Sequence, residues 1–137
     1  MIDTERFGEN RIGIDEIDSQ HVSVLEFYNS ILESKEEKND GEVMDTVIKL
    51  IEHWENHFKY EEDLMEKYGY SGLAEHKAKH EGILETVLDL KKADPKGHIE
   101  AISTLSFLLN LWIDQHIGNE GGEDKILGKF LQSKGLT

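Results

Sequence analysis

Residues 42–68 have the sequence EVMDTVIKLIEHWENHFKYEEDLMEKY. Apolar side chains recur in it at steps of three and four, which is the period of an α-helix with one buried face. The repeat includes Leu50 and Trp54 and continues through two polar residues, His57 and Glu61. The stretch therefore predicts a long helix that presents an imidazole and a carboxylate on its core side.

Three other segments have the same period, over residues 19–38, 71–92 and 95–120, with Ser19 as the expected N-cap of the first. Gly69 is placed to end the helix of residues 42–68, since glycine adopts the left-handed conformation of a helix C-terminus. Four amphipathic helices with short connections predict an all-α fold, an up-down-up-down four-helix bundle.

A chain of 137 residues is expected to form a single domain. We expect an N-terminal arm over residues 1–18, the bundle over about 19–120 and a C-terminal segment over 121–137 with a short helix. The arm is expected to pack across the bundle through its apolar residues. These are Ile2, Phe7, Ile12, Ile14 and Ile17.

The composition excludes several classes of function. The formal net charge is −14 and Lys and Arg form no basic stripe, which argues against binding to nucleic acid or to an anionic membrane surface. No apolar run approaches the roughly 20 residues of a membrane span. The chain has no cysteine, so disulfides and thiolate metal sites are excluded. A soluble cytoplasmic protein is the expectation.

Polar residues interrupt the predicted core face of every helix. They are His21, His57, Glu61, His76, His80, His116 and Glu120. Burying them unpaired would cost several kcal/mol each, a cost that bound metal removes. Imidazole and carboxylate without thiolate suit iron or manganese, and also zinc. Seven candidate ligands exceed the needs of one tetrahedral ion, so two ions bridged by carboxylates are indicated.

Four pieces of the chain resemble the hemerythrin family in its single-domain bacterial form. They are GIDEIDSQH (13–21), HFKYEEDLM (57–65), HKAKH (76–80) and LWIDQHI (111–117), which occur in the family's order. The resemblance implies two non-haem iron ions, joined by an oxo or hydroxo bridge, that bind O2 reversibly.

The resemblance also implies roles for individual residues. His76, His80 and His116 would hold one iron, His21 and His57 the other, and Glu61 would bridge them. O2 would bind to the iron with fewer imidazoles. Residues at the positions of the family's apolar pocket wall are Phe58, Trp112, Ile113 and Ile117. Helical spacing adds Leu25, one turn after His21.

The chain departs from the family at the second bridging carboxylate. The family usually has Asp five residues after the last His, and Gly121 stands there. Glu120 is the favoured replacement, because at +4 it shares a helix face with His116, about 6 Å along the axis. Asp124 is the alternative, which requires the chain to fold back at Gly121; Glu123 would lie about 10 Å away on a straight helix.

The leading functional hypothesis is a non-haem di-iron protein that binds O2 reversibly, for carriage, storage or sensing. One alternative is an enzyme, a di-iron peroxidase or oxidase with an altered carboxylate bridge. Another is an iron-binding or iron-sensing module.

Overall fold

The computed structural model describes residues 11–34, 37, 39–92, 98–117 and 122–137; within these ranges the side chains of residues 34, 98 and 115–117 are not described. The elements are α2 (Asp15–Ser34), α3 (Asp40–Tyr68), α4 (Leu73–Leu90), α5 (His98–Leu111), the π-helix η3 (Trp112–Ile117) and α6 (Glu123–Ser133). The described residues contain no β-strand. The predicted all-α class is confirmed.

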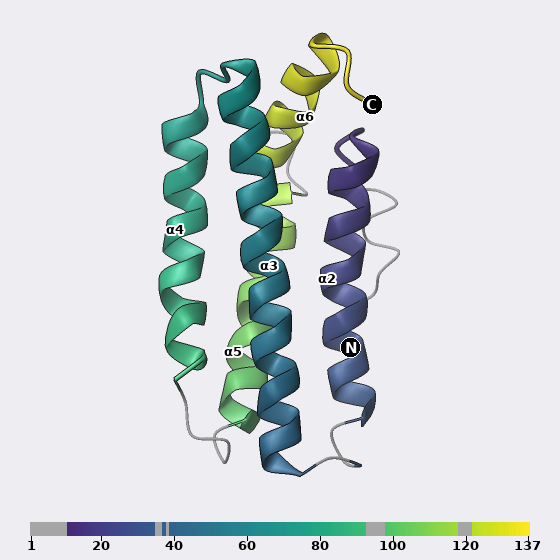
Figure 1. The fold of residues 1–137 in the computed structure, drawn as a ribbon, viewed down its shortest axis with the longest axis vertical. Coiled ribbons are helices and arrows are strands. Elements are labelled where there is room, and N and C mark those ends of the chain that lie inside the picture. The colour runs from purple at the N-terminus through teal and green to yellow at the C-terminus, as the bar shows by residue number, and fades with distance from the viewer. Residues whose placement is uncertain (1–10, 35–36, 38, 93–97, 118–121) are drawn as a thin grey trace.

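Helices α2, α3, α4 and α5 lie side by side, and each runs in the direction opposite to the one before it (Figure 1). This is the up-down-up-down order that the short connections predicted. Helix α6 lies at the end of the bundle where α2 begins and α3 ends (Figure 1). None of the helices in the described ranges is long and apolar enough to cross a membrane.

The ends of the helices have local causes. The first helix begins at Asp15 and not at the predicted Ser19, because the N–H of Asp18 already donates to the carbonyl of Ile14 (2.9 Å) and acidic residues occupy the first turn. Ser19 is therefore an exposed position inside α2. Gly69 ends α3 in the left-handed conformation (φ 68°), as expected.

The arm is anchored at its described end. Ile12, Ile14 and Ile17 are buried, as expected of an arm that packs on the bundle, although Ile17 is already part of α2. Ile2 and Phe7 lie outside the described residues. The carboxylate of Asp18 accepts from the N–H groups of Ile12 (2.8 Å) and Gly13 (3.1 Å), which fixes this turn of the arm.

Helix α6 packs directly on the arm. At Gly128 a side-chain Cβ would stand 2.4 Å from the carbonyl oxygen of Ile12, so only glycine allows this approach. The amide of Gln132 also donates to the carbonyl oxygen of Gly13 (3.3 Å). These contacts hold α6 so that Asp124, in its first turn, is fully buried.

Candidate metal centre

Six buried polar side chains meet inside the bundle. They are His21 from α2, His57 and Glu61 from α3, His76 and His80 from α4, and Asp124 from α6. His57 and Glu61, like His76 and His80, are four residues apart and therefore project from one helix face. Polar groups withdrawn from water need polar partners inside the protein, and these six lie against one another.

Glu61 lies between two sets of imidazoles. Its Oε1 faces the Nε2 atoms of His57 (2.5 Å) and His21 (3.7 Å). Its Oε2 faces those of His76 (3.2 Å) and His80 (3.8 Å). One oxygen is thus directed to each half of the site, which is the arrangement of a bridging carboxylate.

Asp124 repeats this division from the opposite element. Its Oδ2 lies 3.3 Å from Nε2 of His21, and its Oδ1 lies 3.0 Å from Nε2 of His76. Two groups of four possible metal ligands result, with the ligand atoms of each group within 4.8 Å of one another. The groups share Glu61 and Asp124; His21 and His57 complete one, His76 and His80 the other.

The donor set fits a pair of metal ions. Each half offers two imidazole nitrogens and an oxygen from each of two carboxylates, ligands that suit iron and manganese in a helical bundle. The ions would stand between the imidazoles and these two carboxylates, because all four imidazoles direct Nε2 at Glu61 or Asp124.

Comparison with known proteins identifies the family. The protein-family model described as "Hemerythrin HHE cation binding domain" matches residues 12–127 of this chain. The chain belongs to the hemerythrin family. Among its relatives are bacteriohemerythrins of Clostridium acetobutylicum (32% identical, 80% of this chain and 88% of that one), Methylococcus capsulatus (29%, 85% and 86%) and Pseudomonas aeruginosa PAO1 (30%, 79% and 70%).

The hemerythrin ligands predicted from the sequence are mostly in the described part of the chain. His21, His57, Glu61, His76 and His80 lie together in the cluster. The backbone of His116 belongs to η3, but its side chain is not described.

For the second bridging carboxylate, the structure describes the alternative candidate but not the favoured one. Glu120, the favoured residue, lies outside the described residues, so its role stays a prediction. The alternative, Asp124, lies in the cluster, whereas Glu123 is half-buried and belongs to neither ligand group.

Protons occupy part of this hemerythrin site when metal is absent. Burial would lower the pKa of His21, but hydrogen bonds with Asp124 and Glu61 outweigh it and raise the pKa to about 9. The same balance raises the pKa of His76 to about 10. Burial lowers the pKa of His57. Burial and the charge of Asp124 oppose ionisation of Glu61, but its imidazole partners outweigh them and hold the pKa of the carboxyl well below its usual range.

Metal binding should therefore release protons. Below pH 9 the metal-free site keeps the protons of His21 and His76, one in each half, and filling both halves with metal must displace both, so the overall affinity should rise with pH. Two displaced protons correspond to about a 100-fold gain in overall affinity for each pH unit between 6.5 and 8. Titration with Co(II) in weakly buffered solution, with an indicator dye, should detect about two protons released per chain. Equal affinities at pH 6.5 and pH 8, after correction for the competing chelator, would contradict this expectation.

Two residues outside the predicted set orient the imidazoles. Nδ1 of His57 donates to Oε1 of Gln20 (2.7 Å), and Nδ1 of His80 donates to Oε2 of Glu62 (3.1 Å). These bonds fix the Nδ1–H tautomer and leave each Nε2 for a metal. Gln20 and Glu62 each adjoin a candidate ligand in the sequence, but their partners are on other helices, which no local pattern reveals.

An apolar wall surrounds the histidines. Phe58 stacks on His80 with ring centroids 4.0 Å apart, and Trp112 meets His21 edge-on at 5.1 Å. Trp54, which the sequence did not single out as part of the wall, packs against Trp112 at 5.2 Å. The other predicted wall residues, Leu25 and Ile113, are buried, and the side chain of Ile117 is not described. Their role around O2 stays a prediction.

Proposed function

We propose that this chain is a non-haem di-iron protein that binds O2 reversibly, with Glu61 and Asp124 as its two bridging carboxylates. One observation carries the proposal: two groups of four ligands share both carboxylates, and each carboxylate directs one oxygen to each group. Such sharing is expected of a two-metal site and is not needed for a single ion.

In this proposal the halves of the site differ in their imidazoles. His21 and His57 hold one iron, and His76 and His80 hold the other together with His116, as the hemerythrin resemblance implies. Two ferrous ions, when bound, supply the two electrons that reversible O2 binding requires. The half with fewer imidazoles would leave a ligand position for O2, and Trp112 borders that half through its contacts with His21 and His57 (5.1 and 5.7 Å).

The surroundings favour reversible binding over loss of oxidised products. Trp54, Phe58 and Trp112 are at most 1% exposed; Phe58 and Trp112 contact the imidazoles, and Trp54 packs behind them. Apolar side chains at these positions would limit the access of water to iron held by the imidazoles, which would slow its irreversible oxidation.

The test is an O2 cycle on iron-loaded protein. Protein loaded anaerobically with Fe(II) should hold two irons per chain, develop a visible absorption band in air and lose it when O2 is removed. The band should return over repeated cycles. Two bound irons without an O2-dependent band would overturn the proposal. A band that decays once while a reducing co-substrate is consumed would support a di-iron peroxidase or oxidase instead.

A further inference from the structure

We propose that the chain tunes its two metal positions unequally, through a carboxylate behind His80 and an amide behind His57. Glu62 would favour the oxidised, Fe(III) state of the ion held by His76 and His80, relative to the ion held by His21 and His57. The inference rests on the proposed di-iron function and assigns Gln20 and Glu62 as positioning residues.

The contact behind His80 is anionic. Glu62 is next to the bridging Glu61 on α3, and its Oε2 accepts the Nδ1–H of His80 at 3.1 Å. The other oxygen of Glu62 lies 4.0 Å from Nζ of Lys77, a largely exposed residue of α4. A carboxylate that accepts from Nδ1 increases the electron density on the imidazole and makes its Nε2 a stronger donor to metal.

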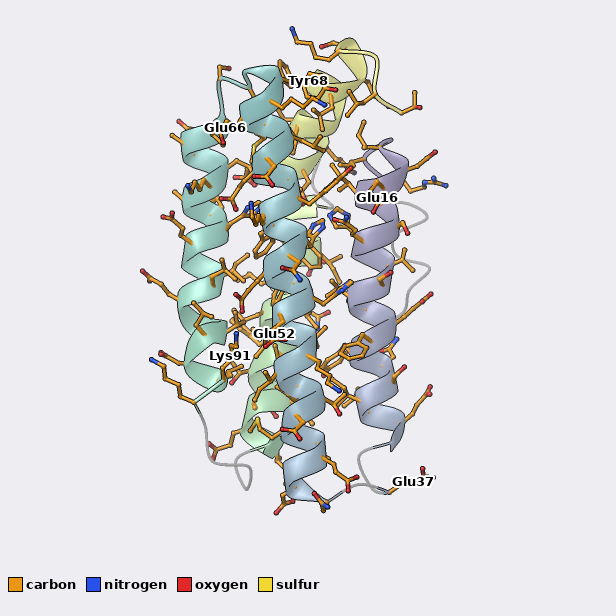
Figure 2. The ribbon with its side chains drawn as sticks, viewed as in Figure 1. Glu16, Glu37, Glu52, Glu66, Tyr68 and Lys91 are labelled. Carbon is orange, nitrogen blue, oxygen red and sulfur yellow. The ribbon has the colours of Figure 1, made fainter. Side chains whose placement is uncertain are left out.

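The contact behind His57 is neutral. Oε1 of Gln20 accepts the Nδ1–H of His57 at 2.7 Å. The amide nitrogen of Gln20 donates to Glu16 at 3.0 Å, which fixes the amide with its oxygen toward His57. Glu16 lies in the first turn of α2, at the end of the bundle near α6 (Figure 2). The acceptor is therefore held firmly but carries no charge.

At both metal positions an imidazole thus donates through Nδ1, but the acceptor is neutral behind His57 and negatively charged behind His80. Outer hydrogen-bond partners of metal-bound imidazole change metal affinity by about 10–100-fold. Because the charge of Glu62 compensates Fe(III) better than Fe(II), we expect about a tenfold difference in oxidation-state preference, equivalent to about 59 mV for one electron. The amide of Gln20 orients the imidazole of His57 but adds no charge that would favour Fe(III).

Glu62→Gln and Gln20→Glu test the inference, because each exchanges amide and carboxylate at nearly constant shape. The measurement is a spectroelectrochemical titration of the di-iron protein, with Mössbauer spectra to identify the ion oxidised. Glu62→Gln should reduce the Fe(III) preference of one ion about tenfold and leave the other ion unchanged. Gln20→Glu should increase the preference of the other ion. The double exchange should reverse which ion is oxidised first.

Controls separate tuning from general effects. Glu85→Gln removes an exposed carboxylate from α4, one turn further from His80, and should shift neither potential. Glu62→Asp keeps the charge and should behave more like the wild type than Glu62→Gln does. Stepwise Co(II) binding gives a second readout, in which Glu62→Gln should weaken one step about tenfold.

The outcomes distinguish this inference from the proposed function. Failure of O2 cycling with the asymmetry intact would overturn only reversible O2 binding. Two-metal loading with equal effects of Glu62→Gln on both ions, or with no effect, would overturn only the asymmetry. A wild-type chain that binds fewer than two metal ions would overturn both.

Discussion

Glu61→Ala should reduce the metal content of the loaded protein from two ions per chain to less than one. Glu61 is fully buried, and its two oxygens face four imidazole nitrogens at 2.5–3.8 Å, so its removal would take a ligand from both ions of the proposed pair at once. We expect each ion to bind at least about 100-fold more weakly. Metal analysis after desalting, together with competition against a chelator, measures both effects.

Two further variants show whether the loss is specific. Glu61→Gln keeps the shape of the side chain without its charge and should also lose metal, although it fills the same space. Glu66→Gln changes an exposed carboxylate near the end of the same helix (Figure 2) and should retain both ions. Full metal content in Glu61→Gln would show that Glu61 is not a bridge.

The sequence predicted most directly the ligand pairs that lie four residues apart on one helix. A step of four residues on a helix fixes the face, so His57 with Glu61 and His76 with His80 could be paired before any tertiary contact was known. The bundle follows from the same periodicity, because four apolar faces can be buried only against one another. Five predicted ligands lie together for these reasons.

The sequence alone does not decide between its two candidates for the second carboxylate, because that choice depends on contacts between distant segments. Asp124 reaches the imidazoles from α6, whose position depends on the close approach of Gly128 to Ile12, 116 residues earlier in the chain. A straight extension of the fourth helix made Glu120 the better candidate. The described helix ends at Ile117 in a π-helical segment, and α6 begins separately at Glu123.

Asp124→Ala should separate the two candidates for the second bridge. Its carboxylate lies 3.3 Å from His21 and 3.0 Å from His76, one imidazole in each half of the site. Its removal should weaken both ions about 100-fold, whereas Glu120→Ala should retain two ions and near-native affinity. Asp124→Asn, which keeps the shape, should lose affinity like the alanine variant. If Glu120→Ala loses metal and Asp124→Ala does not, the bridge is Glu120.

Thermal unfolding gives an independent measure of the same bridge. Metal that binds only the folded chain stabilises it, and 100-fold weaker binding removes about 2.7 kcal/mol of that stabilisation for each of the two ions at saturating metal. The metal-induced rise in Tm should therefore shrink by several degrees in Asp124→Ala and remain in Glu120→Ala. The comparison uses the rise within each variant, since losing a buried carboxylate also changes the stability of the metal-free chain.

Because Asp124 is in the first turn of α6, its loss should also weaken the link between metal binding and the packing of α6 on the arm. Hydrogen exchange of α6 amides should then slow on metal addition in the wild type and in Glu120→Ala, but not in Asp124→Ala.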